Sequence, residues 1–244
     1  MKNILVIGDS CIDRFIYGES IRLCPDAPVP VFSPIETIEG GGMAANTRAN
    51  IKSLGIQCDI LTQPEVIVKT RYVDKKTNHM FLRVDTGEEK ITRIDNIDID
   101  LLQTYNAIAI SDYDKGFLLK EDIETICNNH DMVFVDTKKS INLSYSNALF
   151  IKINEPEYIA SKHILANPIF NDNLIVTLGG KGCKYKDEIY SVNEVEVKDM
   201  SGAGDTFLAG LITDYLLYHD IQKAIKFANI CATKIVQKRG VGIV

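Results

Sequence analysis

Short apolar runs rich in valine and isoleucine recur along the chain, and they restrict its fold more than any other feature. They occupy residues 4–7, 107–110, 132–135, 149–153 and 174–178. A run without polar alternation is typical of a parallel strand whose two faces are both covered. Helical patterns separate these runs, most clearly at 205–218 and 221–236. The alternation predicts an α/β fold with a doubly wound, mostly parallel sheet flanked by helices.

Two stretches do not follow this alternation and predict a small additional β-sheet. Residues 27–38 carry three prolines in a strand-like run, which is typical of an edge strand or a loop. Residues 66–94 contain two apolar runs with polar breaks, the pattern of a β-hairpin. We therefore expect one domain over residues 1–244, with lid segments at about 14–38 and 66–94 inserted in it.

The composition excludes several classes of protein. The formal net charge of −6 argues against a nucleic-acid-binding surface, and 45% hydrophobic with 25% charged residues excludes a disordered chain. No apolar run approaches the roughly 20 residues of a membrane span. The N-terminus lacks a signal-peptide pattern, and the six cysteines have no metal-binding spacing. We expect a cytoplasmic protein with reduced thiols that binds neither nucleic acid nor membranes.

The strongest local signal of chemistry is Asp-Met-Ser-Gly-Ala-Gly-Asp at residues 199–205, directly before a predicted helix. Gly202 and Gly204 allow backbone N–H groups to converge, and the helix start adds its own N–H groups and positive dipole, so an anion would be favoured there. Asp205 would repel that anion unless it accepts a proton from a hydroxyl that attacks a phosphoryl group. A glycine-rich turn with a capping aspartate is the alternative. No P-loop or G-x-G-x-x-G pattern occurs, which disfavours a P-loop NTPase or a dinucleotide-binding enzyme.

A second glycine cluster at residues 40–42 precedes a predicted helix that contains Asn46. It would let a small polar ligand approach the backbone, and Asn46 offers a donor and an acceptor to a hydroxyl. Taken alone, the cluster is more typical of a flexible loop with Asn46 on a helix face. Asp9 and Asp13 follow the first strand, where open α/β sheets bind ligands. We expect a ligand role for Asp13 and leave a turn or cap as the alternative for Asp9.

These motifs resemble the PfkB/ribokinase carbohydrate kinases, in the right order and over nearly the whole chain. The elements that carry the resemblance are Gly41-Gly42 with Asn46, and Asp199 with Gly202-Ala203-Gly204-Asp205. Segments 8–14, 22–31, 111–116 and 136–138 are similar to the branch that phosphorylates D-glycero-D-manno-heptose 7-phosphate. The resemblance implies a ribokinase-like fold with a β-sheet lid, ATP and Mg²⁺ as cofactors, and a homodimer formed through the lid.

The resemblance also implies roles for individual residues. Asp205 matches the catalytic base, and Gly202, Ala203 and Gly204 match the anion hole around the transferred phosphoryl group. The residues that match the nucleotide side are Asn154 and Glu157, which organise Mg²⁺ and phosphate with Glu157 as the metal ligand, Thr177 and Gly179 in a loop, and Asn229 at the adenine pocket.

The sugar side is implied in the same way. Asp13, Gly41, Gly42 and Asn46 match sugar contacts. The substrate's own phosphate would meet Lys69 and Arg71, or Lys115 and Lys138, through charge-assisted bonds. For each of these four cations, a solvated surface charge is the alternative.

One departure from the family bears on the function. Residues 62–64 join almost directly to 66–71, so a strand–helix–strand stretch that usually carries part of the sugar site is missing. We expect an ATP-dependent kinase that phosphorylates the anomeric hydroxyl of D-glycero-D-manno-heptose 7-phosphate. The alternatives are a PfkB-type kinase of another sugar, such as ribose or a hexose, and an inactive shortened homologue that binds sugar phosphate or a partner protein.

Overall fold

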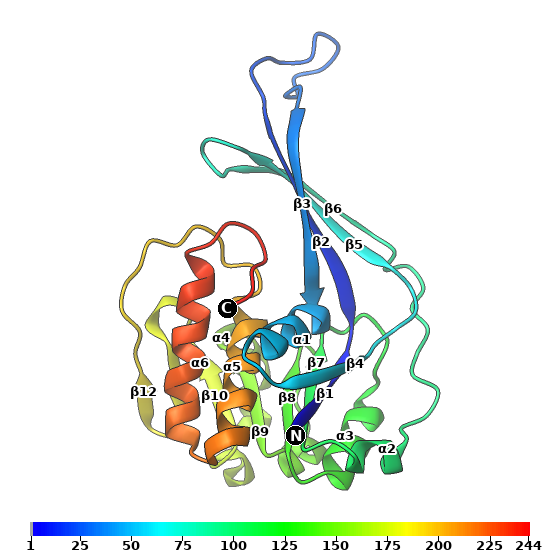
Figure 1. Cartoon of the computed structure of the whole chain (residues 1–244), viewed down its shortest axis with the longest axis vertical. Helices are drawn as coiled ribbons and strands as arrows, with labels where there is room; N and C mark the ends of the chain where they lie inside the picture. Colours follow the sequence, from blue (N-terminus) through cyan, green and yellow to red (C-terminus); the bar gives the residue numbers. More distant parts are fainter. Residues whose placement is uncertain (1) are drawn as a thin grey trace.

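The computed structural model describes residues 2–244, which form a large sheet, a small sheet and six α-helices (Figure 1). The large sheet has the strand order β12-β11-β10-β9-β8-β7-β1-β4. Its strands are β1 (Asn3–Gly8), β4 (Gln57–Leu61), β7 (Ala107–Asp112), β8 (Val133–Thr137), β9 (Phe150–Asn154), β10 (Leu174–Thr177), β11 (Cys183–Tyr185) and β12 (Glu188–Tyr190). All pairs from β4 to β10 are parallel, and the β11–β12 hairpin adds antiparallel strands at one edge. The predicted mostly parallel sheet is confirmed.

Helices cover both faces of the large sheet. α1 (Ala44–Ser53), α5 (Ala203–Tyr218) and α6 (Ile221–Val236) pack on one face, and α2 (Ile99–Gln103), α3 (Lys120–Asn129) and α4 (Glu155–Leu165) pack on the other. Short 3₁₀ turns lie at Leu143–Asn147, Pro168–Phe170 and Gly179–Lys181. Alternate strand residues point to opposite layers, so Ile4 and Val6 join one core while Leu5 and Ile7 join the other. Burial of both faces explains why the strands read as unbroken apolar runs.

The small sheet takes its strands from both predicted lid segments. Its strands are β2 (Ser10–Glu19), β3 (Ser33–Met43), β5 (Ile67–Asp74) and β6 (Met80–Thr86), in the order β3-β2-β5-β6. The two segments suggested an antiparallel sheet, and the outer pairs are antiparallel, but the central β2–β5 pair, which joins the two segments, is parallel. The first segment was predicted too short, because β2 and β3 extend beyond residues 14–38 at both ends. Residues 40–42 therefore lie in β3 and not in a flexible loop.

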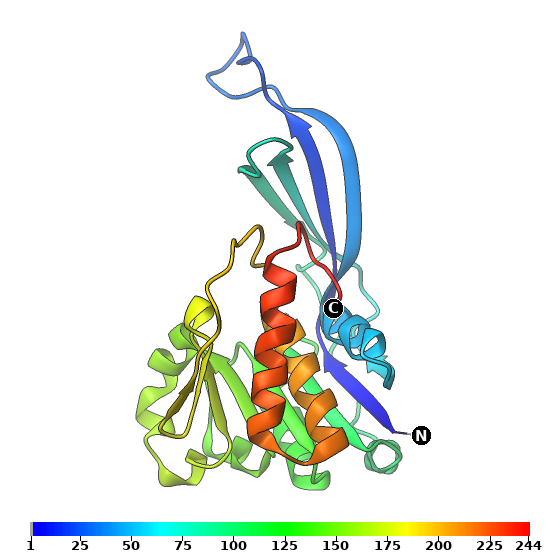
Figure 2. The same cartoon turned by 60° about the vertical axis from the view of Figure 1, so that its left-hand side comes forward.

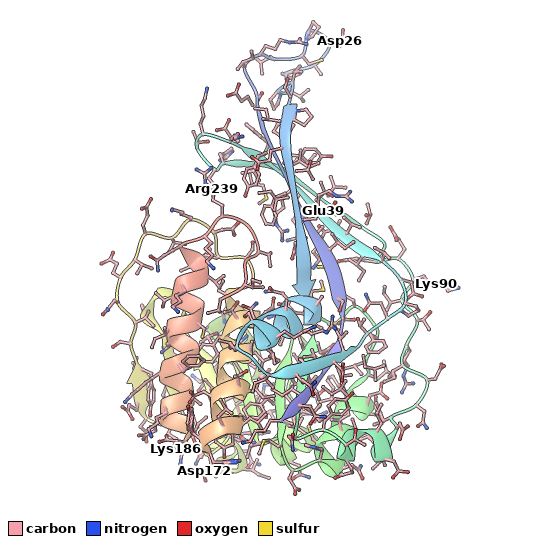
Figure 3. The ribbon with its side chains drawn as sticks, in the orientation of Figure 1. Asp26, Glu39, Lys90, Asp172, Lys186 and Arg239 are labelled. Atoms are coloured by element: carbon pink, nitrogen blue, oxygen red, sulfur yellow. The ribbon has the colours of Figure 1, made fainter. Side chains whose placement is uncertain are left out.

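The small sheet rises above the edge of the large sheet where α1 and α5 begin (Figures 1 and 2). Asp26 marks its tip, and the ion pair between Lys186 and Asp172 lies at the opposite end of the molecule (Figure 3). Within residues 2–244 no helix is long and apolar enough to cross a membrane, and the six cysteines form no disulfide.

Candidate active site

The predicted anion site lies at the start of α5. Gly202 precedes the helix in the left-handed region, with φ of 78°, a conformation that favours glycine. The first N–H groups of a helix have no partner within it, so this end attracts anions. Ala203 differs from the prediction in one respect, because its N–H donates to the Met200 carbonyl at 3.3 Å. The anion hole would therefore depend on the N–H groups that follow, beginning with Gly204.

Asp205 is buried in the first turn of α5, with 3% of its surface exposed. Its Oδ1 accepts a hydrogen bond from the Tyr113 hydroxyl at 2.7 Å, and its Oδ2 accepts one from Asn46 Nδ2 at 3.1 Å. Burial raises the pKa of Asp205 to about 6, although the hydrogen bonds from Tyr113 and Asn46 act in the opposite direction. A carboxylate with such a pKa is suited to accept a proton near neutral pH.

Lys152 and Asp136 form a buried ion pair beside this turn. The distance from Lys152 Nζ to Asp136 Oδ2 is 2.5 Å, and each side chain is 4% exposed. A Cβ placed on Gly204 would lie 3.0 Å from Lys152 Nζ, so the ammonium is next to the predicted anion hole. No motif in the sequence pointed to Lys152. Its position inside the apolar run of β9 was the available signal, because a buried charge costs free energy unless it is paired.

Of the predicted sugar contacts, Asp13 and Gly42 lie together at the base of the small sheet, whereas Gly41 faces Ala45 of α1. Asp13 on β2 accepts a hydrogen bond from Arg71 on β5, and Gly42 on β3 lies against it. Asn46 connects this group to α5, because its Nδ2 also approaches the Gly202 carbonyl at 3.5 Å. Because α1 begins shortly after Gly42 in the chain, it joins the contact between Gly42 and Asp13 to the contact between Asn46 and Asp205.

Gly42→Ala is expected to raise the KM for the sugar at least tenfold and to lower the melting temperature. An added Cβ would lie 2.0 Å from Asp13 Oδ2 and 2.6 Å from Cys11 Sγ, so the Asp13 carboxylate has to move. Gly40→Ala is the matched control on the same strand, because its Cβ would meet only the Val241 carbonyl oxygen at 3.6 Å. Steady-state kinetics and thermal unfolding of both variants check this. Equal behaviour of the two variants would contradict the packing argument.

The predicted phosphate-binding cations are paired with carboxylates. Lys69 Nζ lies 3.9 Å from Glu88 Oε1, and Lys115 Nζ lies 2.7 Å from Glu88 Oε2. Lys69 is only 7% exposed, and burial lowers its pKa. Arg71, which pairs with Asp13, has a side chain that is 12% exposed. The burial of Lys69 and Arg71 does not fit solvated surface charges.

Arg83 on β6 is a further cation that the sequence analysis missed. The strand register places Arg83 opposite Arg71 on β5, so both belong to the same face of the small sheet. Arg83 is held by a two-bond contact to Asp85, with both nitrogen–oxygen distances 2.7 Å. Only the strand pairing, which the sequence pattern does not specify, brings it beside Arg71.

The predicted nucleotide residues lie in two places. Asn154 and Glu157 form a capping box at the start of α4: Glu157 N–H donates to Asn154 Oδ1, and Asn154 N–H donates to Glu157 Oε2, each at 2.8 Å. Glu157 also pairs with Lys138. Thr177 ends β10, its hydroxyl donates to the Ile153 carbonyl at 3.2 Å, and Gly179 begins the next turn.

Asn229 on α6 lines a pocket of about 480 Å³ between α6 and β12. Its Nδ2 donates to the Tyr190 carbonyl at 2.9 Å. The pocket is lined by Glu188, Ile189, Tyr190, Ser191, Val192, Asn193, Lys226, Asn229, Ile230, Thr233 and Lys234. It has the size for a planar ring system and does not include Thr177 or Gly179. Another pocket, of about 490 Å³ between α4 and β10, contains none of the predicted site residues.

Asp9 has a structural role in the loop that follows β7. It is fully buried, and its carboxylate accepts hydrogen bonds from the N–H groups of Tyr113, Lys115 and Phe117 at 2.8, 3.2 and 3.3 Å. It therefore holds the loop after β7 that carries Tyr113. These contacts fit the alternative in which Asp9 caps a turn, and the ligand role of Asp13 stays a prediction.

Comparison with known proteins defines the class of the chain. The pattern of the pfkB family carbohydrate kinases matches residues 61–244. The fold is similar to that of a ribokinase from Thermotoga maritima, with a TM-score of 0.72, 18% identity and coverage of 99% of this chain and 95% of that one. A nucleoside kinase from Methanocaldococcus jannaschii gives a TM-score of 0.69 at 19% identity, covering 99% and 93%. The chain belongs to the pfkB family of carbohydrate kinases and has a ribokinase-like fold.

The chain is also similar to curated proteins from other organisms. The chain is 30% identical over 295 positions to the bifunctional protein HldE of Helicobacter pylori strain J99, covering 98% of this chain and 64% of the relative. The HldE protein of a Nitratiruptor species is also 30% identical, over 290 positions, covering 97% and 62%. The chain thus spans less than two thirds of the length of these relatives. Because 295 aligned positions exceed 244 residues, the Helicobacter protein also contains segments that this chain lacks within the matched region.

Proposed function

We propose that this chain is an ATP- and Mg²⁺-dependent kinase that phosphorylates the anomeric hydroxyl of D-glycero-D-manno-heptose 7-phosphate. The observation that carries the proposal is the buried Asp205 carboxylate at the anion-attracting start of α5, in contact with Asn46 from the sugar-side cluster. The similarity to HldE proteins and the heptose-branch segments of the sequence support the choice of sugar.

In the proposed reaction Asp205 takes the proton of the anomeric hydroxyl as its oxygen attacks the γ-phosphorus. The bond between the γ-phosphorus and the bridging oxygen breaks, and ADP leaves. The N–H groups at the start of α5 and the Lys152 ammonium stabilise negative charge on the transferred group. No covalent enzyme intermediate is needed, because positioning and charge stabilisation account for most phosphoryl transfer.

The residues present fit a magnesium ion that arrives with ATP. Within residues 2–244 no three His, Cys, Asp or Glu side chains gather as a ready metal site. Mg²⁺ bound to a nucleotide needs only one or two carboxylates, because phosphate oxygens and water complete its shell. Glu157, whose side chain is 17% exposed, offers such an oxygen ligand and would hold the ion after releasing Lys138. The bound ion would neutralise phosphate charge.

The lid cations support a substrate that carries its own phosphate. Lys69, Arg71, Arg83 and Lys115 lie on or beside the small sheet close to Asp13, and their carboxylate partners can be exchanged for a phosphate group. Charge-assisted bonds of this kind are stronger than bonds between neutral groups. A cluster of four cations beside Asp13 exceeds what the hydroxyls of a plain sugar require, so we favour a sugar phosphate over ribose or a hexose.

We also propose a homodimer formed through the outer face of the small sheet. Ile16, Tyr72 and Leu82 are cross-strand neighbours there, and Leu82 is 54% exposed. An apolar row on a sheet is typical of a surface that is covered by a partner. Sedimentation at assay concentration tests this, and a fully active monomer would contradict it.

Lys69→Met is expected to raise the KM for heptose 7-phosphate about 10- to 100-fold and to leave the KM for unphosphorylated heptose within about threefold, because one charge-assisted bond contributes about 1.5–3 kcal/mol. ADP release from a panel of plain and phosphorylated sugars measures both effects. Lys76→Met is the matched control, since Lys76 is also beside the small sheet but its side chain is 77% exposed. An equal change for both sugars would contradict the assignment of the phosphate site.

A further inference from the structure

We propose that Tyr113 is a positioning residue for Asp205, whose hydroxyl holds the carboxylate in its ionised form and so sets the acid limit of activity. The proposal rests on the proposed function only in treating Asp205 as the base. Tyr113 lies in the loop after β7, far from α5 in the sequence, and the composition of that loop does not predict its contact with Asp205.

The contact is direct. The Tyr113 hydroxyl donates to Asp205 Oδ1 at 2.7 Å, while Asn46 Nδ2 donates to Asp205 Oδ2. A donor to an ionised carboxylate favours the ionised form over the protonated one. Burial, and then the charge of Asp205, raise the pKa of Tyr113 well above its usual value of 10. The phenol therefore remains protonated and able to donate near neutral pH.

Three contacts hold Tyr113 in place. Its backbone N–H donates to the buried Asp9 carboxylate at 2.8 Å. Its ring lies near two ammonium groups, with Lys69 Nζ at 5.8 Å and Lys138 Nζ at 5.5 Å from the ring centroid. Both distances are within the range of cation–π attraction. The hydroxyl is thus held by the core of the large sheet, the small sheet and the loop after β8 together.

Other charged and titratable groups also face Asp205. They are Cys11 on β2, Asp136 and Lys138 at the end of β8, and Lys152 on β9. Asp136 raises the pKa of Asp205, and Lys152 lowers it. Tyr113→Phe leaves all of these charges unchanged and removes only the neutral donor. A shift in the titration of Asp205 in this variant is therefore attributable to the hydroxyl.

The first test is the pH profile of kcat/KM for Tyr113→Phe. A hydrogen bond to a charged group is worth about one pKa unit, so the acid limb is expected to move up by about one pH unit. At pH 6 this is a loss of about fivefold, approaching tenfold at lower pH, and at pH 9 activity should return to within about threefold of wild type. Tyr105→Phe is the matched control, since Tyr105 donates to the Asp59 carboxylate at 3.0 Å outside the site. An acid limb at the wild-type position would overturn the proposal, whatever the loss of rate.

The second test needs no turnover. The side-chain carboxyl carbon of Asp205 is titrated by ¹³C NMR in the ligand-free protein, with Asp205→Asn used for assignment. A midpoint about one unit higher in Tyr113→Phe supports the proposal, and an unchanged midpoint overturns it. Because this readout is independent of catalysis, an inactive protein with a shifted midpoint would refute the proposed function and retain the role of Tyr113.

Discussion

Asp205→Asn is expected to lower kcat by about 100- to 10,000-fold, with dissociation constants for ATP and sugar changed less than about threefold. The amide has nearly the same shape as the carboxylate but cannot take the proton of the attacking hydroxyl. Single-turnover kinetics measure the chemical step, and calorimetry with each substrate measures binding. A variant that binds both substrates and still turns over near the wild-type rate would remove Asp205 from the role of base.

The stability of the same variant separates catalysis from unfolding. Burial raises the pKa of Asp205 to about 6, whereas an aspartate in the unfolded chain has a pKa near 4. The ionised carboxylate therefore destabilises the fold increasingly as the pH rises from about 4 to 6. Asp205→Asn removes that buried charge. The variant should therefore be at least as stable as wild type in urea unfolding at pH 8, and its relative advantage should shrink at pH 4. A large loss of stability at pH 8 would mean that the inactivity reflects damage to the fold.

Lys152→Met is expected to lower the free energy of unfolding by about 3–5 kcal/mol, the usual cost of removing one partner of a buried ion pair. Asp136, which is 3% exposed, would lose its ion-pair partner in a buried site. Urea unfolding at neutral pH measures the loss. A cost below about 1 kcal/mol would show that the pair is not closed to solvent.

The double variant Asp136→Asn with Lys152→Met distinguishes stability from chemistry. Neutralising both partners should recover most of the stability, because a buried pair can often be replaced without net cost. Activity should remain at least about 100-fold low, since the ammonium next to Gly204 is still missing from the charge-stabilising site. If the double variant regained wild-type activity, Lys152 would serve only to neutralise Asp136.

The fold was largely predictable because its physical signals are local. β1, β7, β8, β9 and β10 are buried on both faces, so each appears as an apolar run, and α5 and α6 show their helical spacing directly. The small sheet was harder to delimit. Residues 40–42 extend β3 up to Met43, and Gly42 is needed there for the close approach of Asp13 and not for flexibility. Packing across strands, which one sequence does not display, decides that point.

The candidate site was predictable only in part, for the same reason. Asp205 and its glycines form one contiguous motif, and the spacing of Asn154 and Glu157 is the signature of a capping box. The contacts of Tyr113 and Lys152 with the start of α5 join residues far apart in the chain, through the order of strands in the sheet. Such contacts depend on the order of the strands, which no local sequence pattern predicts.

The measurement that tests the central claim most directly is ADP release from Mg²⁺-ATP and D-glycero-D-manno-heptose 7-phosphate, with wild type compared with Asp205→Asn. We predict turnover by wild type and a loss of at least about 100-fold in the variant. Turnover of another sugar alone would retain the kinase and correct the substrate. Binding of sugar phosphate by wild type without release of ADP from any sugar would contradict the account, and the chain would then be a shortened homologue that binds without catalysis.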